Sequence, residues 1–220
     1  MSTYRGYAPP AARQSLAATR AVFGQVMGLV AVTVGFTALG AYLGRNATSG
    51  TGFICMILAL GCVFGLNFAA RKSQELAIGL LFGVGLLLGI GVGGLLNYYA
   101  QAHPSALWQA AGSTAIFISA LGAYGYATRR DLSSWARTLF WAILALLLFG
   151  LITLFVAIPG ANLIYSLLGL GVFGAFTIFD FNRLRRTEMD GAVLIAASIF
   201  LDIFNVFLFM LQLFGGGSRD

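Results

Sequence analysis

The sequence predicts an all-α integral membrane protein with seven transmembrane helices. Of its 220 residues, 59% are hydrophobic and only 9% are charged, whereas soluble domains carry about 25% charged residues. A soluble globule of this length needs a polar shell that this composition does not supply, and lipid removes that need. Seven apolar runs also have about the 17–25 residues that a helix needs to cross the hydrocarbon of a bilayer.

The predicted helices are bounded by short polar or turn-forming breaks. In order, they cover 21–43, 52–70, 75–98, 106–128, 136–158, 161–182 and 191–214. No break is long enough to hold a second domain. We therefore expect a cytoplasmic N-terminal segment over 1–20, one transmembrane domain over 21–214 and a short C-terminal tail over 215–220.

Two of these runs have features of their own. The first is longer than the core of a cleaved signal peptide, which has about 7–15 apolar residues, so it is a membrane span that stays. The third is rich in glycine, and Gly85, Gly89 and Gly93 recur every four residues. This spacing gives a flat helical face that allows close helix packing in lipid. We interpret the face as packing within one subunit and keep dimerisation as the alternative; the oligomeric state stays open.

Basic residues indicate the orientation of the chain. Eleven of the 13 Lys and Arg residues lie in the N-terminal segment or in the second, fourth and sixth breaks. The positive-inside rule therefore predicts a multi-pass protein of the cell (inner) membrane with a cytoplasmic N-terminus. The C-terminus is then outside, unless the last segment is re-entrant. The same distribution favours a topology signal over nucleic-acid binding, although the net charge is +6.

The inventory of reactive residues argues against an enzyme. The one histidine, His103, lies in a break beside Pro104, whereas a haem or metal site needs several His or Cys ligands and an intramembrane serine protease needs a buried Ser–His pair. Cys55 and Cys62 are seven residues apart on one helix, too far for a disulfide, and are interpreted as core residues. We expect no catalytic residue and no cofactor.

Two acids stand out because they lie inside predicted helices. Asp180 is near the cytoplasmic end of the sixth helix, and Asp202 is about 16 Å along the seventh, close to the middle of the membrane. An ionised carboxylate there costs at least about 2.5 kcal/mol and is by default a functional candidate. Helical spacing places polar residues near the two acids, and this polar seam comprises Thr177, Ser198, Asn205 and Gln212.

Structural alternatives exist for both acids. Asp180 could form a simple salt bridge with Arg183 one turn further on, or a cytoplasmic closure with Arg71 at the end of the second helix. Asp202 could be a hydrogen-bonded structural residue of the bundle core. Asp180 also lies nearer the cytoplasm than Asp202, so contact between them requires a tilted sixth helix or a late entry of the seventh.

The residues around both acids resemble a known family. The segment Phe179-Asp180-Phe181-Asn182-Arg183 and the stretch 196–208, which contains Leu201-Asp202-Ile203-Phe204-Asn205, resemble the last two helices of the Bax inhibitor family. The basic turn and glycine-rich helix over 71–94 look like the third-helix region of that family. The abundance of arginine over lysine and the short termini favour a bacterial inner-membrane member.

This resemblance implies six helices around a central seventh. It implies that Asp180 and Asp202 form a hydrogen-bonded pair and that Arg71 closes a cytoplasmic gate by pairing with Asp180. Family members are associated with a pH-sensitive calcium leak. Eukaryotic members suppress cell death, and some bacterial members bind and modulate a membrane-anchored AAA protease.

Three functions remain open at this point. The first is a pH-sensitive calcium leak channel gated by Asp180 and Asp202, whose carboxylates would share a proton and contact Ca²⁺, the transported ion. The second is an interaction protein that modulates a membrane protease or a cell-death or stress pathway without conducting ions. A proton-coupled transporter is third, because the sequence shows no pair of broken helices that would form its substrate site.

Overall fold

The computed structural model describes residues 10–156 and 159–216 and contains seven long helices in that part of the chain. Their bounds are α1 (Pro10–Leu43), α2 (Ser49–Lys72), α3 (Gln74–Ala102), α4 (Pro104–Ala127), α5 (Trp135–Phe155), α6 (Ala161–Leu184) and α7 (Ala192–Gly216). A short 3₁₀ turn, η1 (Met189–Gly191), precedes α7. Each long helix contains a segment long and apolar enough to cross a membrane.

The ends of the helices follow local sequence signals. The side-chain oxygens of Thr48 and Ser73 accept hydrogen bonds from the backbone N–H groups at the starts of α2 and α3, the usual role of an N-cap residue. Pro104 opens α4, where its missing N–H costs nothing. Gly160 precedes α6 with a φ of 71°, a conformation that favours glycine.

The predicted helices are therefore confirmed, with differences at their ends. α1 starts at Pro10, so the second half of the expected N-terminal segment is already helical, and α7 extends to Gly216 into the expected tail. α5 ends at Phe155. The remaining predictions for 1–9, 157–158 and 217–220 lie outside the described residues.

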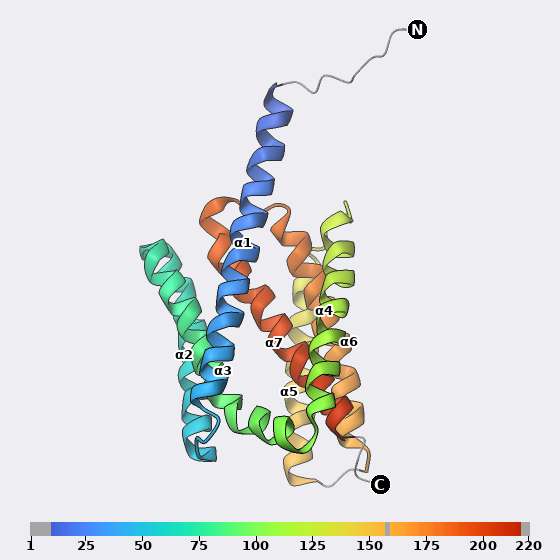
Figure 1. Cartoon of the computed structure of the whole chain (residues 1–220). Coiled ribbons are helices and arrows are strands. Elements are labelled where there is room, and N and C mark those ends of the chain that lie inside the picture. Colours follow the sequence, from blue (N-terminus) through green and yellow to red (C-terminus); the bar gives the residue numbers. More distant parts are fainter. Residues whose placement is uncertain (1–9, 157–158, 217–220) are drawn as a thin grey trace.

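The helices form two groups with α7 between them (Figure 1). α1 and α2 pack on α3, and α4 and α5 pack on α6. α7 contacts α1, α2, α3, α4 and α6. In its apolar stretch of 18 residues 56% are buried, against 11% in the corresponding stretch of α5. The central position expected for the last helix is confirmed. α5 lies at the outside of the bundle, where α6 is its main neighbour.

The glycine face of α3 packs against α1. A Cβ atom on Gly85 would lie 2.7 Å from the backbone oxygen of Thr33, and one on Gly89 would overlap the backbone of Thr37. A Cβ on Gly93 would lie 2.5 Å from the backbone carbon of Gly44. The two backbones are therefore in direct contact, and the expected packing of this face within one subunit is confirmed.

Candidate functional site: two buried acids between α6 and α7

Asp180 is buried near the C-terminal end of α6, with 3% of its surface exposed. Its Oδ1 atom lies 3.4 Å from Nη1 of Arg183, one turn further along the same helix. The hydroxyl of Ser198 on α7 donates a second hydrogen bond to the Asp180 carboxylate. The carboxylate is therefore held by its own helix and by α7.

Asp202 is buried on α7, with 4% of its surface exposed. It lies one helical turn after Ser198, so both side chains are on the face of α7 that meets Asp180. The two carboxylates are close enough to interact electrostatically. The Oδ2 atom of Asp202 is buried and has no hydrogen-bond partner among the described residues. A buried polar atom without a hydrogen-bond partner costs free energy, so its presence points to a functional constraint.

The oblique path of α7 explains how the acids come together. Asp180 is four residues from the end of α6, whereas Asp202 is ten residues from the start of α7, a difference of about 9 Å along two parallel helices. Figure 1 shows α7 crossing the bundle obliquely, so that its ten residues span less depth than they would in an upright helix. The sequence allowed a tilted sixth helix or a late entry of the seventh, and the oblique helix in the structure is α7.

A cleft of about 270 Å³ lies next to the acid pair, between α2, α6 and α7. Its polar lining consists of Asn67, Arg183 and Ser198. Two of these three residues are the hydrogen-bond partners of Asp180. The cleft therefore brings a polar surface up to the first acid, and the rest of its lining is apolar: Val63, Leu66, Leu194, Ala197 and Leu201.

Comparison with known proteins identifies the family of the chain. The profile of the family described as "Inhibitor of apoptosis-promoting Bax1" matches residues 19–219. The chain belongs to the Bax inhibitor family. Its relatives include bacterial membrane proteins, and the expected membership of this family is confirmed.

Three relatives illustrate the range of similarity. A protein of Deinococcus radiodurans named "Uncharacterized protein" is 31% identical over 75% of this chain and 74% of its own. An "Uncharacterized membrane protein" of Vibrio cholerae is 29% identical over 74% of each chain. The "Modulator of FtsH protease YccA" of Escherichia coli K12 is 25% identical over 94% of this chain and 95% of its own.

Arg71 differs from what the family resemblance implies. Its side chain is exposed at the end of α2, and among the described residues the ion pair of Asp180 is formed with Arg183. The reason is geometric: Arg183 is one turn away on the same helix, whereas the cleft lined by Asn67 separates α2 from α6. The expected Arg71–Asp180 closure is therefore absent from this conformation of the described chain, and the salt bridge with Arg183 takes its place.

Members of the expected polar seam have different surroundings. Ser198 contacts Asp180, as described above. The hydroxyl of Thr177 donates to the carbonyl of Phe173 at 2.8 Å, and the amide of Asn205 donates to the carbonyl of Leu201 at 2.8 Å. These bonds stay within one helix. At the opposite end of the bundle, Gln212 donates to Asn162 of α6 at 3.4 Å.

Asn182 is a buried polar residue to which the sequence argument gave no role. Its amide nitrogen lies 3.2–3.3 Å from the backbone oxygens of Gly125, Thr128 and Arg130, and its Oδ1 accepts a hydrogen bond from Arg186 at 3.0 Å. The end of α6 thus holds the end of α4 and the loop after it. The feature of the sequence that could have indicated this contact is the amide side chain of Asn182 within the segment Phe179-Asp180-Phe181-Asn182-Arg183.

Arg186 extends the same contact to the loop between α4 and α5. Its Nη1 atom lies 2.7 Å from Oδ1 of Asp131, which also accepts hydrogen bonds from the hydroxyl and the backbone N–H of Ser133. The Ser133 hydroxyl, its N–H and the Arg186 guanidinium lower the pKa of Asp131 to about 2. We call Asn182, Arg186, Asp131 and Ser133 the α6 clamp.

Proposed function

We propose that this Bax inhibitor family protein is a pH-sensitive cation leak channel, with calcium as the transported ion, gated by Asp180 and Asp202. The observation that carries the proposal is the electrostatic interaction of two buried acids on adjacent helices, Asp180 and Asp202, one of which has an oxygen without a partner among the described residues. Intramembrane acids are costly and usually mark an ion or proton pathway.

The proposed gate is a shared proton. Two buried carboxylates in contact cannot both be ionised at low cost, so they hold one proton between them and titrate as a pair. With the proton in place, the acid pair and the Ser198 bond hold α6 and α7 together. Loss of the proton leaves two negative charges that repel each other, which separates the helices and attracts a cation.

Calcium suits this site as a passing ion. Carboxylate oxygens are its natural ligands, but a firmly held Ca²⁺ takes about 6–8 oxygens. Asp180 and Asp202 supply four carboxylate oxygens at most, and water from the neighbouring cleft would supply the others. Weak coordination of this kind allows an ion to leave as well as to enter.

The proposed orientation has the basic end of the bundle in the cytoplasm. α1 starts there, and Arg71, Lys72, Arg183, Arg185 and Arg186 lie at the same end. Because cytoplasmic loops carry the excess of Lys and Arg, this end is assigned to the inside. The cleft beside Asp180 then lies in the cytoplasmic half of the bundle.

A flux assay tests the channel. The full chain is reconstituted in liposomes, and release of trapped Ca²⁺ is followed with a dye from pH 5 to pH 8. We expect leak to rise with pH in the wild type and to lose this dependence in Asp180→Asn. Glu75→Gln, which removes an exposed acid at the start of α3, is the matched control. Equal flux in protein-free and protein-containing liposomes at every pH would overturn the proposal.

The second candidate function is modulation of a membrane protease without ion conduction. It is favoured by the E. coli relative, which is aligned over nearly the whole of this chain and is named a modulator of FtsH protease. That name and the family description refer to a modulator and an inhibitor rather than to a catalyst. Pull-down with a membrane-anchored protease of that type separates the two functions. Binding that survives loss of both aspartates, in a protein without flux, favours the second.

A further inference from the structure

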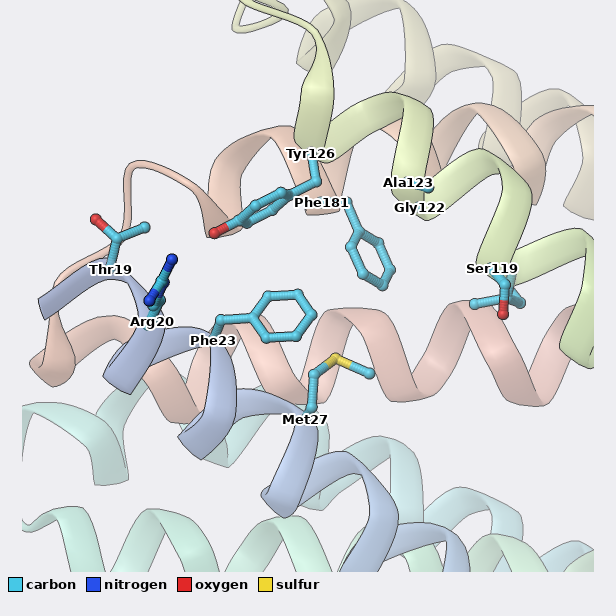
Figure 2. A pocket seen from close by; sticks show the side chains of 10 residues that line it. Thr19, Arg20, Phe23, Met27, Ser119, Gly122, Ala123, Tyr126 and Phe181 are labelled. Carbon is cyan, nitrogen blue, oxygen red and sulfur yellow. The ribbon is translucent and has the colours of Figure 1, made fainter. Parts of the chain in front are cut away.

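A lateral groove separates α1 from α4 at the basic end of the bundle (Figure 2). It has a volume of about 790 Å³. Phe23 and Met27 of α1 form one wall, Ser119 and Ala123 of α4 form the other, and Phe181 of α6 contributes from behind. Apart from its mouth and Ser119 the groove is apolar, and it is distinct from the cleft beside the acid pair.

A second, separate cavity of about 350 Å³ lies between the same two helices nearer their other end. It is lined by Ala38 and Ala41 of α1, Ala115 of α4, and Phe200 and Phe204 of α7, among others. Thr19 and Ala41, the outermost α1 residues of the two linings, are 22 positions apart, about 33 Å along the helix. This span is close to the hydrocarbon thickness of a bilayer, about 30 Å. The two cavities together therefore extend over more than the depth of one leaflet, which is the depth that an acyl chain occupies.

The mouth of the groove is polar and basic. Figure 2 shows the guanidinium of Arg20 and the hydroxyl of Tyr126 at the same end, with Ser119 at the other. Arg20 is exposed and forms no ion pair within the described part of the chain, and the lining contains no acid. Phe23 packs edge-on against Tyr126 with ring centroids 5.2 Å apart, so an aromatic pair lines the groove beside its mouth.

We propose that this groove binds an anionic phospholipid. The phosphate lies between the Arg20 guanidinium and the Tyr126 hydroxyl, and one acyl chain runs along Phe23 and Met27 toward α7. Basic pockets between transmembrane helices on the cytoplasmic side are suited to anionic head groups, and guanidinium–phosphate hydrogen bonds are strengthened by both charges. A chain that reaches the second cavity touches Phe200 and Phe204, on the helix that carries Asp202.

Native mass spectrometry of the full chain tests this proposal. The purified protein is delipidated in detergent and titrated with phosphatidylglycerol or phosphatidylcholine. We expect preferential binding of one phosphatidylglycerol, and Arg20→Gln should weaken it about fivefold, since one basic residue near the surface contributes about 1 kcal/mol. Arg137→Gln, which removes a charge from an exposed residue at the same end of the bundle, should leave the affinity unchanged.

The apolar wall is tested separately. Ala123→Leu fills the groove from an exposed position on α4 and should reduce binding of phosphatidylglycerol. Ala120→Leu, also exposed on α4 but not part of the lining, is its control. Equal affinity for both lipids, an unchanged affinity in Arg20→Gln, or a groove filled in native membranes by a partner's transmembrane helix that excludes phosphatidylglycerol would overturn the proposal.

Discussion

The hydroxyl of Ser198 on α7 donates a hydrogen bond to the carboxylate of Asp180 on α6. Asp202 lies one turn beyond Ser198 and interacts with the same carboxylate. One face of the central helix therefore presents to Asp180 both a group that stabilises its charge and a group that opposes it. A change in the protonation of either acid alters the contact between α6 and α7, and the proposed gate depends on this relationship.

Arg183 rather than Arg71 is expected to control the charge of Asp180. Arg183→Gln removes the 3.4 Å ion pair and with it the positive charge that favours the ionised form of Asp180, so the acid pair keeps its proton more readily and leak at a given pH should decrease. Because half of the Arg183 side chain is exposed, the pair contributes at most about 1 kcal/mol, or roughly a fivefold change in leak. Liposome flux measures this effect. Arg71→Gln serves as the comparison, and a larger decrease there would show that Arg71, and not Arg183, controls the charge of Asp180.

Gly89 is expected to be essential for the packing of α3 on α1. Gly89→Ala places a methyl group against the backbone of Thr37, which cannot move aside as a flexible side chain could. Overpacking of this kind costs about 1–3 kcal/mol. Thermal unfolding in detergent should show a lower transition temperature. Gly83→Ala, where a Cβ meets nothing within 4 Å, is the matched control, and equal transitions in the two variants would contradict the interface.

Asn182 is expected to protect the loop between α4 and α5 from local opening and from proteolysis. Asn182→Asp keeps the shape of the side chain but cannot donate to the carbonyls of Gly125, Thr128 and Arg130. Unpaired buried groups cost about 1–3 kcal/mol each, so local opening should become at least about tenfold more frequent. Tryptic cleavage after Arg130 then speeds up. Asn97→Asp, at an exposed amide that accepts only from Gln101, should leave cleavage unchanged.

The α6 clamp also predicts a titration outside the membrane. The pKa of Asp131 is lowered to about 2 from its ordinary value of 3.8, by the Ser133 hydroxyl first and then by the Ser133 N–H and Arg186. Because the pKa is lowered, the stability that ionised Asp131 contributes is fully present above its ordinary pKa of 3.8 and is lost as the pH falls through about 2. The carboxyl signal of Asp131 in NMR should titrate near pH 2, and Ser133→Ala should move the midpoint upward. A wild-type midpoint near 4 would show that the clamp is open in solution.

Most of the fold could be predicted from the sequence, because length and hydropathy fix how many helices span a bilayer. The glycine spacing on α3 also predicted a packing face. The choice of salt bridge could not be predicted: Arg71 and Arg183 are both compatible with Asp180 along the sequence, and only the cleft between α2 and α6 separates them. Nor could the role of Asn182, since its partners are carbonyls more than 50 residues away.

The calcium leak as a function of pH, compared in Asp202→Asn and in the double variant with Asp180→Asn, tests the proposed acid pair most directly. If the two acids share one proton and act as a unit, the single variant loses the pH dependence of leak in liposomes and the double variant changes little more. A single variant that keeps the wild-type pH profile, or two substitutions whose effects simply multiply, would contradict the proton-sharing gate.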